Sequence, residues 1–130
     1  MKIFDTNRLW VIVTCVAAVL ALSFHLYAQA TGLYYVDWVN IDVYTHFFSS
    51  FAIACIILNF NLPTKKDAHW IIVIVLIIVI GLVWEMSEEI VEFYGILPWI
   101  ENNLVNAIQD LFQDVLGAVL ACWICDKIVP

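Results

Sequence analysis

The chain has 130 residues, of which 65% are hydrophobic and 13% are charged, and its formal net charge is −7. Its mean hydropathy of +0.97 excludes an ordinary soluble domain, in which about half the residues are apolar and about a quarter are charged. The five Lys and Arg residues form no basic patch, so nucleic acid is not an expected partner. The composition predicts an integral membrane protein, and the length suits a single transmembrane domain over residues 1–130.

Four segments are long and apolar enough to cross a bilayer as helices, which takes about 20 apolar residues. These helices are predicted at residues 9–28, 43–60, 68–94 and 104–129. The first segment also resembles a signal peptide, because it combines a lysine with an apolar run and an Ala-x-Ala ending. Its apolar run is long for that purpose, so we interpret it as a membrane helix. The predicted fold is an all-α, integral membrane four-helix bundle.

Charge is distributed unevenly between the two ends of these helices. If successive spans alternate in direction, all five basic residues fall at one end, which the positive-inside rule assigns to the cytoplasm. Both termini are then cytoplasmic, and we expect a multi-pass protein of the cell's inner (cytoplasmic) membrane. The opposite, outer half holds nine of the twelve acidic residues: Asp37, Asp42, Glu85, Glu88, Glu89, Glu92, Glu101, Asp110 and Asp114.

Several polar residues are expected at one depth in that outer half. At about 1.5 Å per helical residue, His46, Glu85 and Asp110 each lie roughly 21 to 22 Å above the cytoplasmic end of their span. Asp114 lies about 6 Å deeper, and His25 is at about 25 Å. All four helices are therefore predicted to place a polar residue in one layer. We interpret His25 as a packed or interfacial histidine.

Helical spacing places the acidic residues on defined faces. Glu85, Glu88, Glu89 and Glu92 follow an i, i+3, i+4, i+7 pattern, which makes one stripe on the third helix. Glu89 and Glu92 are expected at the aqueous rim. On the last helix, the stripe of Asp110 and Asp114 continues into the small residues Gly117 and Ala121, which permit a close helix contact. Asp42 is interpreted as the N-cap of the second helix.

Carboxylates in lipid are costly, and closely spaced ones do not all remain ionised without help. Shared protons, a bound cation or water from an outward-facing cavity would each relieve the repulsion. A histidine among carboxylates is a typical ligand set for Zn, Mn or Fe, whereas oxygen ligands alone suit Mg or Ca. We predict a divalent metal ion held by His46, Glu85, Asp110 and Asp114. A proton-sharing cluster and a hydrogen-bonded structural plug are the alternatives.

Three motifs between residues 42 and 121 resemble, in the same order, those of VanZ-like proteins and the related YjdF-type inner-membrane proteins. "DVYTHFFSSF" resembles their Asp-x-x-x-His-Phe motif, "WEMSEEIVEFYG" their glutamate motif, and "NAIQDLFQDVLGAVLA" their final Asp-x-x-x-(Asn or Asp)-x-x-Gly helix. Asp114 replaces the Asn, and Glu88 the Gln, that VanZ-like members usually have. These differences favour the YjdF type and weaken transfer of the glycopeptide-resistance association of VanZ. The resemblance implies where a site lies more than what chemistry it performs.

Three classes of function stay open, and whether the protein is an enzyme is undecided. In the first, water activated by the metal attacks a phosphate or acyl group of a lipid headgroup or envelope substrate, with Glu85 or Glu88 as general base. The second is a cation- or proton-binding transport protein, which would need a homo-oligomer because four helices are few for alternating access. The third is a non-catalytic membrane partner with a structural polar cluster. We favour metal binding with headgroup or envelope chemistry, because the helices below Asp114 are almost wholly apolar.

Overall fold

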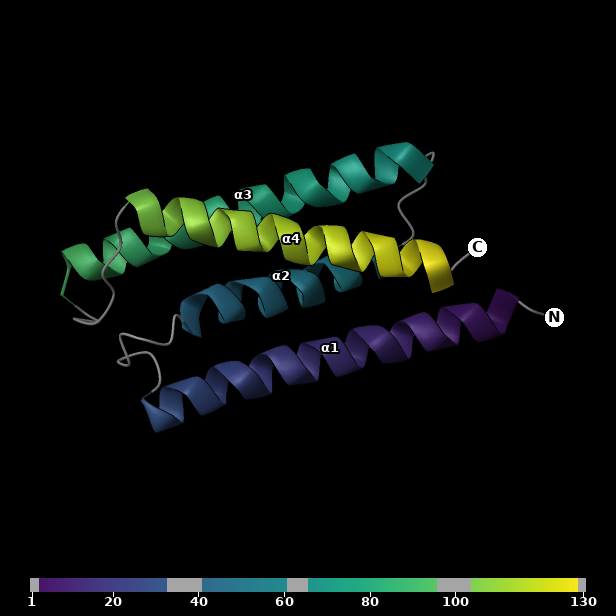
Figure 1. Cartoon of the computed structure of the whole chain (residues 1–130), viewed down its shortest axis with the longest axis horizontal. Coiled ribbons are helices and arrows are strands. Elements are labelled where there is room, and N and C mark those ends of the chain that lie inside the picture. The colour runs from purple at the N-terminus through teal and green to yellow at the C-terminus, as the bar shows by residue number, and fades with distance from the viewer. Residues whose placement is uncertain (1–2, 33–40, 61–65, 96–103, 129–130) are drawn as a thin grey trace.

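The computed structural model describes residues 3–32, 41–60, 66–95 and 104–128, and these form four helices with no strand among them. The helices are α1 (Ile3–Thr31), α2 (Ile41–Asn59), α3 (Lys66–Phe93) and α4 (Leu104–Ile128) (Figure 1). Each is long and apolar enough to cross a membrane. The predicted all-α membrane bundle is confirmed.

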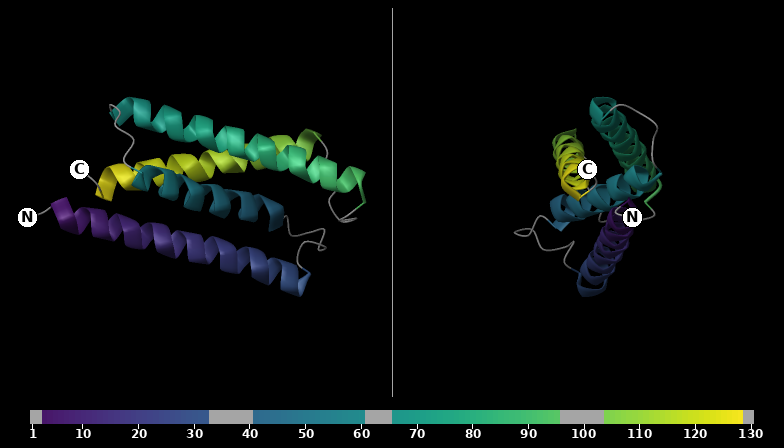
Figure 2. Two further views of the ribbon diagram at one scale, coloured as in Figure 1. Left: turned by 180° about the vertical axis from the view of Figure 1, so that it is seen from behind. Right: turned by 90° about the vertical axis from the view of Figure 1, so that its right-hand side faces the viewer.

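The four helices lie side by side with alternating directions, so that α1 begins and α4 ends at the same end of the bundle (Figure 1). The α2 helix packs most extensively against α4, and α1 packs mainly on α2. The α3 helix lies chiefly on α4 and touches α2 less (Figure 2). The α2–α4 pair is therefore the centre of the fold. The orientation of the bundle, with the end that carries the basic residues in the cytoplasm, stays a prediction from the sequence.

The described helices differ from the predicted spans mainly at their ends. The α1 helix extends from Ile3 to Thr31, beyond the apolar run, and is followed by Gly32 with a φ of 70°. The sequence suggested that Asp42 is the N-cap of the second helix. The α2 helix begins at Ile41, however, so Asp42 lies in its first turn. Thr45 supports this turn, because its hydroxyl donates hydrogen bonds to the carbonyl oxygen of Asp42 at 2.8 Å and to Oδ1 at 3.3 Å.

The interior of the bundle changes character along its length. The half that contains the end of α2 and the start of α3 has an apolar core of small and aliphatic side chains: Trp10, Ala54, Cys55, Leu58, Val73, Ile77, Ala118, Ala121 and Cys122. Most buried polar side chains of the described residues lie toward the other end, namely Thr45, His46, Ser50, Glu85, Asp110 and Asp114. Large apolar side chains are exposed along all four helices, as expected of surfaces that contact lipid.

Gly117 marks a close approach of α4 to α2. A Cβ at this position would lie 2.5 Å from the carbonyl oxygen of Phe47 and 2.9 Å from the amide nitrogen of Phe51. It would also collide with the Ser50 hydroxyl. Two of these neighbours are backbone atoms that do not rotate away, so only glycine permits this distance between the helices. The predicted close contact below the polar layer is present.

We expect Gly117→Ala to lower the free energy of unfolding by about 1–3 kcal/mol, the usual cost of overpacking a dense interior. Titration of the purified protein with a denaturing detergent would measure this change. Val105→Ala, on the exposed surface of α4, is the control and should change the free energy by less than about 0.5 kcal/mol. An unchanged stability of the Gly117→Ala protein would show that the helices separate freely at this point.

Candidate functional site

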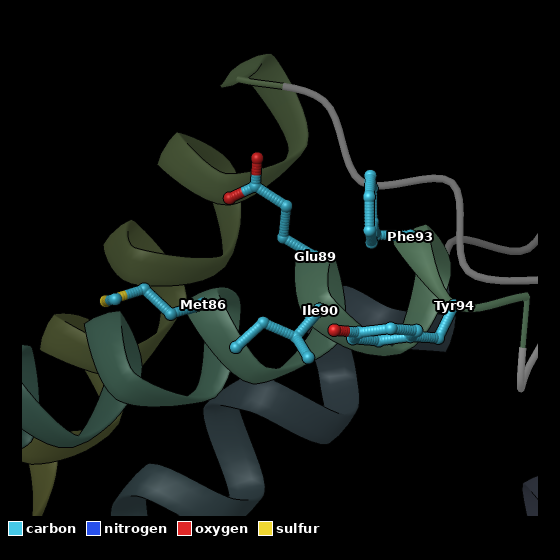
Figure 3. Close-up of a pocket in the computed structure, with 5 residues that line it drawn as sticks. All are labelled: Met86, Glu89, Ile90, Phe93 and Tyr94. Carbon is cyan, nitrogen blue, oxygen red and sulfur yellow. The ribbon is translucent and has the colours of Figure 1, made fainter.

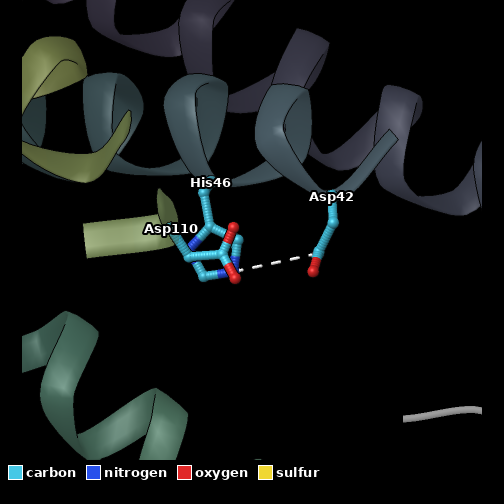
Figure 4. A group of neighbouring side chains, drawn as sticks. All are labelled: Asp42, His46 and Asp110. Carbon is cyan, nitrogen blue, oxygen red and sulfur yellow. Dashed lines mark ion pairs between the residues drawn. The ribbon is translucent and has the colours of Figure 1, made fainter. Parts of the chain in front are cut away.

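The first two turns of α2 present an aspartate and a histidine on one face. Asp42 and His46 are four residues apart, a spacing that places their side chains one above the other on a helix. The imidazole is 8% exposed, and its Nε2 atom lies 3.8 Å from Oδ1 of Asp42, which is 34% exposed. Figure 4 shows this pair with Asp110 of α4 beside the ring. The histidine is thus held at the inner edge of a polar region that opens through Asp42.

The imidazole of His46 lies among carboxylates from α2, α3 and α4. Its Nδ1 atom is 3.3 Å from Oδ1 of Asp114 on α4, within hydrogen-bonding distance. Its Nε2 atom is 4.0 Å from Oε1 of Glu85 on α3, and both of these carboxylates are buried. The two ring nitrogens therefore face different partners. Nδ1 faces Asp114, whereas Nε2 faces Asp42 and Glu85.

Asp110 is the most deeply buried acid of the site, with none of its surface exposed. The side-chain amide of Asn106 donates a hydrogen bond to its Oδ2 atom at 3.0 Å, while Oδ1 has no hydrogen-bond partner. One potential ligand atom from each of Asp42, His46 and Asp110 lies within 4.8 Å of the other two. These three residues could therefore contact a single cation.

The electrostatics of this group are dominated by negative charge. The carboxylate of Asp110 is repelled by those of Asp42, Glu85 and Glu88 and is attracted by His46. Among the described residues, the basic ones lie at the other end of the bundle: Arg8 early in α1, Lys66 at the start of α3 and Lys127 in the last turn of α4. A bound cation or shared protons would offset this repulsion, which is costly in a buried setting.

The sequence prediction placed His46, Glu85, Asp110 and Asp114 at one level, and the structure brings all four together. It adds Asp42, which the N-cap interpretation had set aside. The spacing of four residues between Asp42 and His46 was the signal that could have indicated it.

The remaining acidic residues of α3 have different surroundings. Glu88 is half-buried and accepts a hydrogen bond from the indole nitrogen of Trp84 at 2.7 Å, while its carboxylate is still repelled by Asp42 and Glu85. Glu89 is exposed in a shallow surface pocket with Met86, Ile90, Phe93 and Tyr94 (Figure 3). Its expected place at the rim agrees with this exposure. The side chain of Glu92 lies outside the described residues.

His25 was predicted to reach a similar depth on α1 without belonging to the site. It is half-buried, and it is not among the residues that could share a cation with His46. The α1 helix packs mainly on α2, on the side away from α3. The site is therefore built from α2, α3 and α4.

A sequence model of the family described as "Predicted membrane protein (DUF2238)" matches residues 3–129, which include all four helices. The chain belongs to this family of membrane proteins. No curated protein and no solved structure matches the chain. The family match agrees with the membrane-spanning fold, and the more specific resemblance to VanZ-like proteins stays a prediction.

A site selected for binding a ligand, and not for stability, is expected to lower the free energy of unfolding when the ligand is absent. We expect Asp110→Asn to raise the free energy of unfolding of the metal-free protein by roughly 0.5–2 kcal/mol, because it removes a repelled charge and keeps an acceptor for Asn106. Chelator-treated protein in a detergent titration would provide the measurement. Glu89→Gln, on the same acidic end but exposed, should have no effect.

A loss of stability in Asp110→Asn would contradict this prediction. It would show that the cluster of acidic residues is a structural plug, in which each carboxylate helps to hold the helices together.

Proposed function

We propose that the protein is a membrane metalloprotein that binds one divalent metal ion toward the outer face of the cytoplasmic membrane. The ligands would be Nε2 of His46 and carboxylate oxygens of Asp42, Glu85 and Asp110. The observation that carries the proposal is the convergence of Asp42, His46 and Asp110 within 4.8 Å, with one oxygen of the fully buried Asp110 lacking a hydrogen-bond partner.

The distances around Nε2 suit such an ion. Bonds from Zn²⁺ to nitrogen and oxygen ligands are about 2.0–2.2 Å, so two ligand atoms of a tetrahedral ion lie roughly 3.3–3.6 Å apart, slightly less than the distances around Nε2. Nε2 of His46 is 3.8 Å from the Asp42 oxygen and 4.0 Å from the Glu85 oxygen. Small side-chain rotations would bring these atoms to bonding positions without moving the helices.

In this arrangement Asp114 supports the histidine and is not itself a ligand, which revises the role predicted from the sequence. A histidine that binds metal through one nitrogen usually donates its other N–H to a carboxylate or carbonyl, which orients the ring and sets its tautomer. Asp114, 3.3 Å from Nδ1, is placed to accept that hydrogen bond. Nε2 then keeps its lone pair for a metal ion, beside the carboxylate oxygens of Asp42 and Glu85.

The donor set limits the metal. One imidazole with several carboxylates suits Zn, Mn or Fe, and Mg fits less well because it prefers oxygen ligands and retains water. The described cysteines are not proposed as ligands, since Cys55 and Cys122 belong to the apolar core in the other half of the bundle, Cys125 packs against that core and Cys15 is exposed on α1.

The resemblance to VanZ-like and YjdF-type proteins supports one shared site in these proteins. Its three motifs contain Asp42 and His46, Glu85, and Asp110 with Asp114, and these five residues meet around one imidazole. Residues far apart in the sequence that match in order and then converge in space are expected of a functional centre.

We further propose that this site acts on a lipid headgroup or envelope substrate. Glu88 lies one turn beyond Glu85 toward the end of α3 and is half-buried, so it is the candidate general base. It would take a proton from a water molecule whose oxygen bonds to phosphorus or to an acyl carbon. The ester oxygen would then leave with that proton.

The distribution of polar residues favours such a one-sided site over transport. The buried residues on the other side of Asp114 are mostly apolar, from Ala118 and Ala121 on α4 to Val73 and Ile77 on α3, and the buried Thr14 there is hydrogen-bonded to Asn59. An ion path through the bilayer needs polar groups along its length. Cation flux into vesicles containing the purified protein would instead support the transport alternative.

The metal proposal is tested by mass spectrometric metal analysis of protein purified without chelator. We expect near-stoichiometric divalent metal in the wild type and its loss in His46→Ala, Glu85→Gln and Asp110→Asn. Asp114→Asn should weaken binding by about 10–100-fold, the usual cost of removing the partner of a metal-bound histidine.

The matched control is Glu89→Gln. It makes the same substitution as Glu85→Gln, on the same helix and one turn away, but at an exposed position. It should retain the metal. Folded wild-type protein that holds no metal and takes up none from added Zn²⁺, Mn²⁺ or Fe²⁺ would refute the proposal and favour a proton-sharing carboxylate cluster.

The headgroup proposal has a separate test. Metal-loaded protein in vesicles of mixed phospholipids should release soluble headgroup or fatty acid, measured by mass spectrometry. Glu88→Gln should keep its metal and lose this activity at least about 100-fold, as is usual for a general base. Retained activity in Glu88→Gln would exclude this role for Glu88.

A further inference from the structure

Gly81 lies on α3 one helical turn before Glu85, and it is buried against α4. A Cβ at this position would lie 2.5 Å from Oδ2 of Asp114 and 2.8 Å from a methyl carbon of Leu111. The backbone of α3 therefore contacts the carboxylate of Asp114 directly, at a point where any side chain would occupy the same space.

The same carboxylate contacts the imidazole through its other oxygen. Oδ1 of Asp114 is 3.3 Å from Nδ1 of His46, while Oδ2 faces Gly81. Asp114 thus lies between the backbone of α3 and the ring on α2. Its carboxylate has little freedom to rotate, because it is only 6% exposed and packed from both sides.

The glycine is otherwise unfavourable where it stands. In a helix interior glycine costs about 0.5–1 kcal/mol relative to alanine. Its neighbours in the chain, Ile80 and Leu82, are large and exposed, as expected for a lipid-facing surface. The close contact with Asp114 is the feature of the structure that accounts for a residue without a side chain.

We propose that Gly81 is a positioning residue that holds the Asp114 carboxylate against Nδ1 of His46. By doing so it keeps the Nδ1 proton in a hydrogen bond and leaves Nε2 directed at Asp42 and Glu85. The proposal rests on the metal site above only in the assignment of Nε2 as a ligand. The geometry of the Asp114–His46 pair is independent of any metal.

Substitution of Gly81 has two physical outcomes, and each disturbs a different contact of the site. An alanine methyl group either displaces the Asp114 carboxylate from the imidazole, or it pushes α3 away from α4. In the second case Glu85, one turn along α3, moves away from Nε2 as well. A loss of metal affinity is expected from either movement.

The test is the Nδ1–H proton of His46 in metal-free protein, observed by NMR with histidine labelled at its ring nitrogens. A hydrogen bond to a carboxylate shifts this proton downfield and slows its exchange with water, whether or not the ring is charged. The signal is assigned by its absence in His46→Gln. We expect it in the wild type and expect Gly81→Ala to remove it and to weaken Zn²⁺ binding by about 10–100-fold.

Ile77→Ala is the control for general destabilisation. Ile77 is buried on α3 one turn before Gly81 and belongs to the apolar core, so this variant should unfold at a lower concentration of denaturing detergent than the wild type. The Nδ1–H signal should nevertheless persist, because Asp114 and His46 stay in contact. Loss of the signal in Ile77→Ala as well would overturn the specific role of Gly81.

A second variant separates packing from positioning. Gly81→Ala combined with Leu111→Ala removes the contact with Leu111 and leaves the one with Asp114. We expect this protein to fold and still to lack the Nδ1–H signal. A signal restored in the double variant, or failure of both variants to fold, would overturn the proposal, since Gly81 would then serve helix packing alone.

The two proposals fail separately. If the wild type binds no metal but Gly81→Ala still removes the Nδ1–H signal, the metal site is wrong and the positioning role stands. If the wild type binds metal and Gly81→Ala retains both the metal and the signal, the positioning role is wrong.

Discussion

The structure depends on one buried imidazole surrounded by carboxylates. His46 belongs to α2, Asp114 to α4 and Glu85 to α3, so the contacts of a single ring connect three helices. Charged groups in a membrane interior are costly unless they are paired. Within the part of the chain that the structure describes, the His46 ring is the basic group that lies close enough to pair with these acids. The close approach of α4 to α2 at Gly117, and to α3 at Gly81, brings the acids within reach of the ring.

The apolar half of the bundle has a different role, which is to confine the cluster around His46 to one end of the bundle. Aliphatic and small side chains form most of the core beyond Asp114, and the buried polar side chain described there, Thr14, is uncharged and hydrogen-bonded to Asn59. The carboxylates therefore have no continuation toward the other face, whereas Asp42 is partly exposed in the first turn of α2. A ligand is expected to enter past Asp42 and Glu88 and to meet Asp110 last.

Sequence reasoning located the helices and the level of the site, because hydropathy and the rise per residue determine both. It brought His46, Glu85, Asp110 and Asp114 together for that reason. Rise per residue says nothing about how a helix is rotated, so the division of contacts between Nδ1 and Nε2 was not predictable. Asp42 was missed because an aspartate near a helix start usually serves as a cap. The role of Gly81 depends on a contact with another helix, which its own neighbours in the chain do not reveal.

The remaining question is why a fold would keep so many acids at one place. A structural plug would be expected to satisfy all its polar atoms, yet Oδ1 of Asp110 has no hydrogen-bond partner although the residue is fully buried. Ionised carboxylates at Asp42, Glu85, Glu88 and Asp110 would repel one another, and a bound cation or shared protons would relieve that repulsion. A group that costs stability in the free protein and recovers it on binding is expected of a site selected for its ligand. We therefore propose cation binding, and not support of the fold, for the arrangement around His46.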